Sequence, residues 1–113
     1  MANAYKVLGQ LSDASAGDVT LVADQNGETI VSTIVVCNRA SAERQFRIAV
    51  REGGEALDNK QYISYDVPVP ANDTIFLTLG VTLADDDLIT VGAYDSGSGA
   101  TDVSFSAFGT VIT

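Results

Sequence analysis

Apolar and polar residues alternate along most of this 113-residue chain, in short segments separated by turn residues. The clearest segment is 44–51, in which Phe46, Ile48 and Val50 fall on one face and the polar residues Gln45, Arg47 and Arg51 fall on the other. Because successive side chains of a β-strand point to opposite faces of a sheet, this segment has one apolar face and one solvated face. No helical spacing persists for more than one turn. The pattern therefore predicts an all-β fold.

Eight segments have this strand pattern and are rich in Val, Ile, Thr, Phe and Tyr. They cover residues 5–10, 19–23, 29–38, 44–51, 61–67, 74–83, 88–94 and 103–112. Asn26-Gly27 is the strongest hairpin signal, because both central residues of a tight hairpin turn need positive φ, and it is predicted to join the second and third strands. Pro68 and Pro70 have no N–H to donate, so we expect residues 67–70 at a sheet edge or in a crossing between sheets.

Strands at this spacing, without alternating helices, predict a compact antiparallel β-sandwich of jelly-roll or immunoglobulin-like type, with a small barrel as the alternative. A chain of this length supplies one domain, residues 1–113, which buries about 65% of its unfolded surface. Residues 1–17 are weakly patterned. They are expected to form either an N-terminal arm or an edge strand.

Two segments allow a prediction of which side chains face the core. Phe105 and Phe108 have opposite parity, so one of them leaves the core face unless a β-bulge near Gly109 intervenes. An outward ring either contacts another chain or caps the end of the core, and Phe108 is a candidate interface residue for this reason. Segment 74–83 has an inward stripe opposite three threonines, and the stripe consists of Ile75, Leu77, Leu79, Val81 and Leu83.

The chain carries fifteen acidic and six basic residues, and its formal net charge is -9. This charge repels phosphate backbones and anionic lipids, so neither nucleic acid nor a membrane is expected as a partner. Five of the six basic residues gather between residues 39 and 60, whereas every charged residue after Lys60 is acidic. Such polarity would give identical copies complementary surfaces and predicts a homo-oligomer; ordinary local pairing is the alternative.

Two arginines in the basic stretch lie on the solvated face of segment 44–51. Arg47 and Arg51 are therefore candidate interface residues. Like charges on one strand face repel each other unless carboxylates lie nearby. We expect these carboxylates to come from a neighbouring subunit.

The side-chain inventory contains no recognisable catalytic set. There is no histidine, which excludes imidazole-based triads and the common zinc sites, and no phosphate-binding or dinucleotide-binding glycine motif is present. We therefore expect no enzyme activity and no cofactor. The run 85–87 of three aspartates could offer oxygens to Ca²⁺, but as an acidic turn it needs no metal, and none is predicted.

The tyrosines, the single cysteine and the N-terminal residues each allow a further prediction. Tyr62, Tyr65 and Tyr94 could stack on sugar rings in a receptor- or carbohydrate-binding module, or they could complete the core. The single cysteine, Cys37, follows an apolar run and is expected to be a buried, inert thiol. The N-terminal residues include no apolar stretch long enough for a signal peptide, so we expect synthesis in a host cytoplasm.

Several of these segments, in this order and spacing, resemble the small virion structural proteins of tailed bacteriophages, particularly those that infect cyanobacteria and other marine bacteria. The segments that carry the resemblance are residues 34–39, 46–50, 62–66, 72–74, 77–80 and 103–109. The resemblance implies a non-catalytic virion component present in many copies, with the major capsid protein or tail proteins as partners. A capsid decoration, or cement, protein is the first expectation; a neck, baseplate, tail or fibre component is the alternative.

Overall fold

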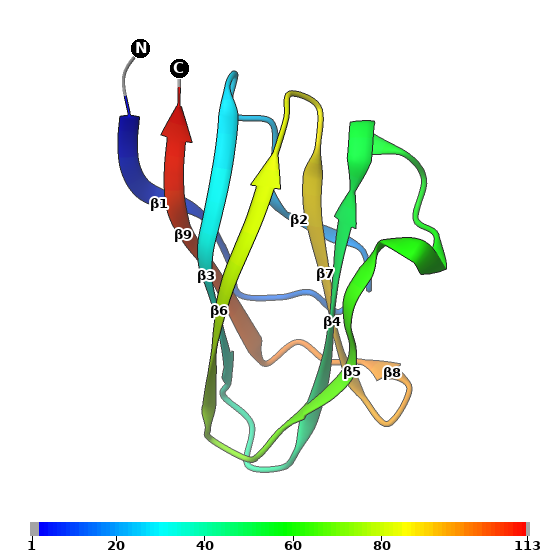
Figure 1. Ribbon diagram of the computed structural model, residues 1–113. Coiled ribbons are helices and arrows are strands. Elements are labelled where there is room, and N and C mark those ends of the chain that lie inside the picture. Colours follow the sequence, from blue (N-terminus) through cyan, green and yellow to red (C-terminus); the bar gives the residue numbers. More distant parts are fainter. Residues whose placement is uncertain (1–2, 113) are drawn as a thin grey trace.

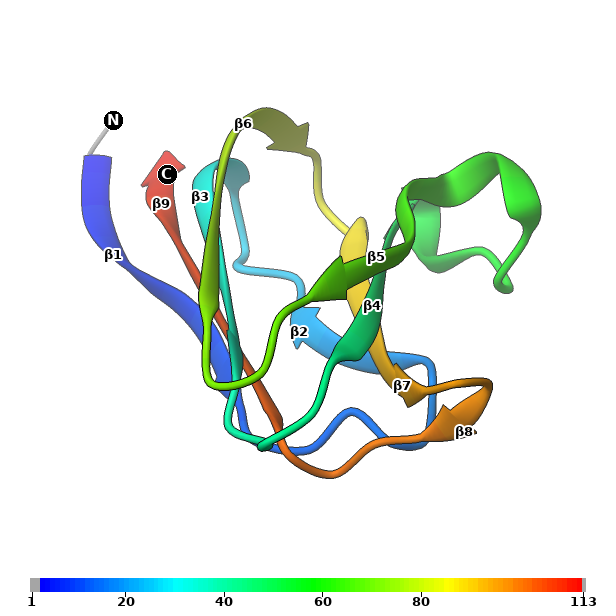
Figure 2. The same cartoon turned by 90° about the horizontal axis from the view of Figure 1, so that it is seen from below.

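The computed structural model describes residues 3–112, which form two antiparallel sheets packed face to face around one hydrophobic core (Figures 1 and 2). Sheet A has the strand order β1 (Asn3–Leu11), β9 (Val103–Ile112), β3 (Glu28–Asn38) and β6 (Thr74–Leu83). Sheet B has the order β2 (Val19–Val22), β7 (Leu88–Asp95), β4 (Arg44–Arg51) and β5 (Tyr62–Val69), and the short β8 (Ser98–Gly99) pairs with β7. Two 3₁₀ turns, η1 (Glu52–Gly54) and η2 (Asn59–Gln61), connect β4 to β5. The predicted β-sandwich is confirmed, and the sheets do not close into a barrel.

The strand pairing is nested. β4 pairs with β5, β3 with β6, β2 with β7, and β1 with β9, and these pairs belong alternately to sheet B and sheet A. The chain is thus one long antiparallel ribbon that is wound across both sheets, and this is jelly-roll topology. Of the two sandwich topologies expected from the sequence, the jelly roll is the one observed.

The hairpin predicted at Asn26-Gly27 is wrong. Asn26 does adopt positive φ (57°), and its N–H donates to Asp24 Oδ1 at 2.9 Å, but β2 and β3 lie in different sheets. The nested pairing gives each of these strands a distant partner, so the turn becomes a crossing between sheets. A two-residue hairpin forms instead at Ser96 and Gly97, between β7 and β8, with φ values of 49° and 94°.

Two other predictions about strand position are confirmed. Pro68 lies in β5, the edge strand of sheet B, and Pro70 begins the crossing from β5 to β6. The predicted inward stripe of β6 packs against the core, whereas Thr78 and Thr82 are exposed on the other face.

The two phenylalanines of β9 point to opposite faces of sheet A, as their odd spacing in the strand predicts. Phe105 is 1% exposed and meets Phe46 of sheet B edge to face, with ring centroids 6.4 Å apart, whereas Phe108 lies on the outer face. The register shifts that accommodate this strand lie in its neighbours: one in β1 after Val7 and one in β3 after Val31. The bulge therefore does not return Phe108 to the core.

Cys37 is only partly buried, contrary to expectation. It pairs across the sheet with Thr74 and Ser104, on the outer face of sheet A, because its parity in β3 is opposite to that of the core residue Val36. Within residues 3–112, no helix has the length and apolar character needed to cross a membrane.

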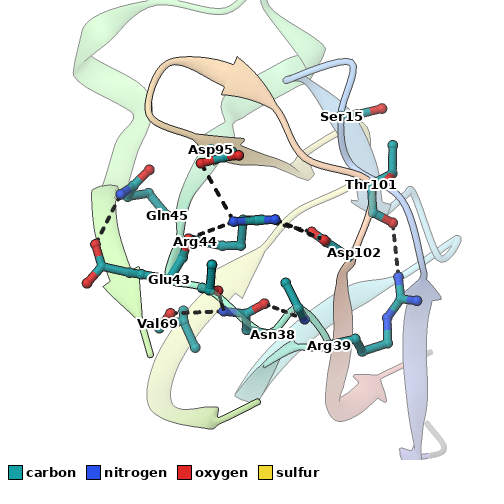
Figure 3. Close-up of polar contacts among 12 residues, drawn as sticks. Ser15, Asn38, Arg39, Glu43, Arg44, Gln45, Val69, Asp95, Thr101 and Asp102 are labelled. Carbon is teal, nitrogen blue, oxygen red and sulfur yellow. Dashed lines mark hydrogen bonds and ion pairs between the residues drawn. The ribbon is translucent and has the colours of Figure 1, made fainter. Parts of the chain in front are cut away.

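Asn38 ties together the two chain crossings at the lower end of the sandwich in Figure 1, and its contacts are drawn in Figure 3. Its side chain is buried, and its amide nitrogen donates to the carbonyls of Ala42 (2.9 Å), Val69 (3.0 Å) and Pro70 (3.1 Å). Its amide oxygen accepts the N–H of Ala40 at 2.9 Å. One side chain thus satisfies backbone groups on the β3–β4 crossing and at the end of β5.

Replacement of Asn38 by Asp tests this role. The substitution keeps the shape but turns the donor toward three carbonyl oxygens into a buried carboxylate, so we expect a loss of about 3 kcal/mol or more in the free energy of unfolding. Urea denaturation at neutral pH measures it. Asn72→Asp adds the same charge at an exposed position of the same corner and is expected to change stability little; equal effects of the two substitutions would contradict the assignment.

Candidate functional site

Arg47, a predicted interface residue, lies on the outer face of sheet B between two tyrosine rings. Its guanidinium carbon is 4.1 Å from the ring centroid of Tyr65 and 4.3 Å from that of Tyr94. Its Nε and Nη2 donate to the two carboxylate oxygens of Asp66, at 2.7 and 3.3 Å. This pairing raises the pKa of Arg47 above its ordinary value, and burial raises the pKa of Tyr94. Three strands, β4, β5 and β7, supply this cluster, which we call the Arg47 cluster.

The backbone is adapted to the Arg47 cluster. Asp66 has positive φ (53°) in the middle of β5, an uncommon conformation for a non-glycine residue. It coincides with a register shift between β4 and β5: residue 46 pairs with residue 67, whereas residue 48 pairs with residue 64, so that β5 has one extra residue between the two pairs. The irregularity turns the Asp66 carboxylate toward Arg47, and it has no signature in the alternation of the sequence.

Arg51 is also neutralised within the chain. Its Nη1 lies 3.2 Å from Asp18 Oδ2, and its Nε donates to the Glu55 carbonyl at 2.7 Å. The carboxylate partners of Arg47 and Arg51 are therefore Asp66 and Asp18 of the same chain, and the expectation that a neighbouring subunit supplies them is wrong. A role for either arginine at an interface stays a prediction.

Arg44 holds the β7–β9 connection to β4 (Figure 3). Its Nε and Nη2 donate to the two carboxylate oxygens of Asp102 at 3.1 and 3.2 Å, and its Nη1 lies 3.6 Å from Asp95. The hydrogen bonds from Arg44 lower the pKa of the Asp102 carboxyl group. Arg44 and Arg47 are thus paired with acids from the C-terminal half inside one copy. Charge complementarity between copies is consequently no longer a reason to expect a homo-oligomer.

Phe108 lies on the opposite side of the sandwich from both arginines. It lines a hollow of about 560 Å³ on the outer face of sheet A, together with Tyr5, Lys6, Val7, Ser32, Gly109 and Thr110. The three predicted interface residues therefore do not share a surface. Phe76, which is 72% exposed on the same outer face, was missed by the sequence interpretation. The alternation of the sequence could have identified Phe76, because it is two residues from the exposed Thr78 and therefore lies on the face opposite the inward stripe.

The tyrosines considered for sugar stacking have different environments. Tyr65 is 55% exposed, whereas Tyr62 and Tyr94 are partly buried and the Tyr94 hydroxyl donates to the Gly17 carbonyl at 3.2 Å. Tyr62 meets Tyr65 edge to face, with centroids 4.9 Å apart. A hollow of about 340 Å³ beside them is lined by Gln45, Arg47, Asp66, Tyr94, Ser96 and Gly97.

The acidic turn after β6 is organised by its own hydrogen bonds. The Asp87 carboxylate accepts the N–H groups of Gly53 (2.7 Å) and Ala84 (2.8 Å), so it serves as a cap for two turns. Asp86 has positive φ (71°), as a turn position requires. Residues 3–112 contain no group of three or more acidic, cysteine or histidine side chains placed to hold a metal ion.

No protein-family model matches the chain, and no curated protein matches it in sequence. Solved structures do match its fold. A chain of the T13 viral particle of infectious bursal disease virus has a TM-score of 0.55 at 12% identity, and one from the Gx strain of that virus has 0.53 at 16% identity. Each match covers 96% of this chain but only 30% and 32% of the virus chains, so the protein spans about a third of their length.

A third match has the same size as this chain. The core of the Drosophila protein NLP, whose structure has been related to pentamer formation and histone binding, has a TM-score of 0.53 at 12% identity. That match covers 99% of this chain and 100% of the NLP core. At these identities, the three likenesses establish a shared fold.

Substitution of Arg47 tests the internal pairing. Arg47→Glu places a carboxylate against Asp66 and removes the cation from two rings, so we expect a loss of about 1 to 3 kcal/mol in the free energy of unfolding. Arg47→Lys keeps the charge but not the planar stacking or the two-pronged hydrogen bond, and is expected to fall between Glu and wild type. Chemical denaturation measures all three proteins. An unchanged midpoint in Arg47→Glu would mean that the cluster contributes nothing to folding.

The Arg44–Asp102 pair predicts a dependence of stability on pH. Because the folded-state pKa of Asp102 is lowered, its contribution is fully present above the unfolded-state pKa of about 3.9 and is lost as pH falls through the lower folded-state value. The difference between the urea midpoints of wild type and Asp102→Asn should thus be largest near pH 7 and shrink below about pH 4. A difference that stays constant with pH would contradict this linkage.

Proposed function

We propose that this chain is a non-enzymatic structural protein of a tailed-phage virion, and that it is a decoration protein that binds the assembled capsid and strengthens it. The observation that carries the proposal is the jelly roll itself, which matches part of a viral-particle chain over 96% of this chain. The sequence resemblance to small virion proteins of tailed phages supports the same role.

The surface chemistry supports a role in assembly rather than catalysis. The charged side chains of β4 are paired with carboxylates of the same chain, and the chain contains no histidine. Its largest exposed apolar side chains lie on sheet faces, as Tyr5, Tyr65 and Phe76 do, rather than in a deep cleft. Repeated docking on a lattice uses such modest surfaces many times over.

Deletion of the gene from the virus that encodes the chain tests the proposal. Particles without the protein should still assemble, but should lose their DNA at a lower temperature or on osmotic shock, and added purified protein should restore them. Quantitative mass spectrometry of wild-type particles should find copies in the hundreds, as a capsid lattice requires. A count of about six or twelve would instead favour the neck, baseplate, tail or fibre alternative and overturn the capsid role.

A receptor- or carbohydrate-binding module is a second candidate, favoured by the exposed ring of Tyr65 beside the hollow at Arg47. Aromatic faces next to planar polar side chains suit the stacking of sugar rings. Binding of the isolated chain to host cells, lost in a folded Tyr65→Ala variant, would support this role. Absence of binding to any host surface would exclude it.

A further inference from the structure

The outer face of sheet A is uncharged across three successive rows of paired residues. Residues directly opposite each other on neighbouring strands share a face of the sheet, so the pairing defines the rows. From β1 to β6 they read Tyr5–Thr110–Ile30–Thr82, Val7–Phe108–Thr33–Thr78 and Gln10–Ser106–Val35–Phe76. This neutrality is unusual in a chain with fifteen acidic and six basic residues.

This face has a projection at one edge and a hollow near the other. Phe76 on β6 is 72% exposed, although its neighbours in β6, Ile75 and Leu77, pack against the core. The hollow of about 560 Å³ lies mainly over β1 and β9, with Val7 and Phe108 in its lining and Ser32 of β3 at its side. Phe76 is not among the residues that line the hollow of its own chain, and three strand spacings, roughly 14 Å, separate its strand from β1 at the far edge of the sheet.

We infer that this face binds a second copy of the same chain, with Phe76 of each copy inserted into the Val7–Phe108 hollow of the other. Phe76 lies in the Gln10–Ser106 row and the hollow beside the Val7–Phe108 row, so the two-fold axis runs between the facing sheets at an oblique angle to the strands, perpendicular to the line from Phe76 to the hollow. Because projection and hollow share one face, both are filled at once, and the contact closes with two copies.

Charge and area favour a second copy as the occupant. Each copy has a net charge of -9, so two copies repel each other least through a face with few acids, and the three central rows of sheet A bring no charge to the contact. Lys6 in the lining of the hollow and Glu28 in the row next to Ile30 are charged side chains at the margin of these rows. Four strands of about ten residues present roughly 600 Å² of flat area, and side-chain relief raises the accessible area toward the roughly 800 Å² per partner of a standard interface.

The outer face of sheet B is less suited to such a contact. It carries Arg47 and Arg51 with their carboxylate partners. The segment that precedes β2 covers part of it, and the Gly17 carbonyl in this segment accepts a hydrogen bond from the Tyr94 hydroxyl. Gly92 is required beneath this segment, since an added Cβ would lie 2.6 Å from the Gly17 oxygen. On the outer face of sheet A, by contrast, Tyr5, Ile30 and Phe76 are exposed.

Sedimentation equilibrium of the purified chain tests the inference, and it is independent of any role in a virion. Wild type should form a dimer of twice the 11.8 kDa chain mass. Phe76→Asp and Val7→Lys should each weaken dimerisation about tenfold or more, because each buries a charge at the contact. The double variant should recover to within about threefold of wild type, because the introduced carboxylate of one copy then faces the introduced ammonium group of the other.

Ile63→Asp is the matched control, since Ile63 is 47% exposed on β5 of sheet B. It should dimerise as wild type does, and circular dichroism should show that all variants are folded. A wild-type monomer at every concentration, an undiminished dimer in Phe76→Asp, or a dimer lost only in Ile63→Asp would overturn the inference. A double variant as weak as the two single losses combined would show that Phe76 does not enter the hollow, which would also overturn it.

Discussion

The jelly roll depends on holding the ribbon where it passes from one sheet to the other, and Asn38 is the residue that does so. At this corner the β3–β4 crossing lies next to the end of β5, and both present carbonyl groups that accept hydrogen bonds from the Asn38 amide. A buried carbonyl without a donor would cost about 1 to 3 kcal/mol, so a single amide that serves three of them fixes the corner. With it fixed, Phe46 and Phe105 meet from opposite sheets, and the inner faces of the other strands pack around them.

The two outer faces of the sandwich differ in how they handle charge. Sheet B keeps its charged residues close to their partners, and Arg47 is enclosed by Asp66, Tyr65 and Tyr94, so that its charge strengthens the fold. On the outer face of sheet A, three rows of paired residues instead combine hydroxyl, aliphatic and aromatic side chains and carry no charge. A protein with this division can stay dispersed through its overall charge while keeping one neutral face for assembly.

Alternation along the chain was sufficient to locate the eight main strands and the inward stripe of β6, because one buried face imposes a period of two. It could not locate the sheet crossing at Asn26-Gly27, since a local turn preference does not encode which distant strand is the partner. The candidate interface residues show the same limit. Parity correctly predicted that Phe105 and Phe108 lie on opposite faces of their strand, but the partners of Arg47 and Arg51 depend on Asp66 and Asp18, which only the folded chain brings close.

The nested ribbon also determines how the molecule would respond to mechanical load. β1 and β9 are adjacent and antiparallel, with Asn3 opposite Ile112, so the start of β1 and the end of β9 lie side by side at the same end of the sandwich (Figure 1). Tension applied through both ends would pull this strand pair apart like a zipper, one pair of residues after another, instead of shearing all its hydrogen bonds together. Force transmitted through the outer face of sheet A would not load the β1–β9 pair in this way. A tether attached at the start of β1 and the end of β9 would separate the two strands at low force.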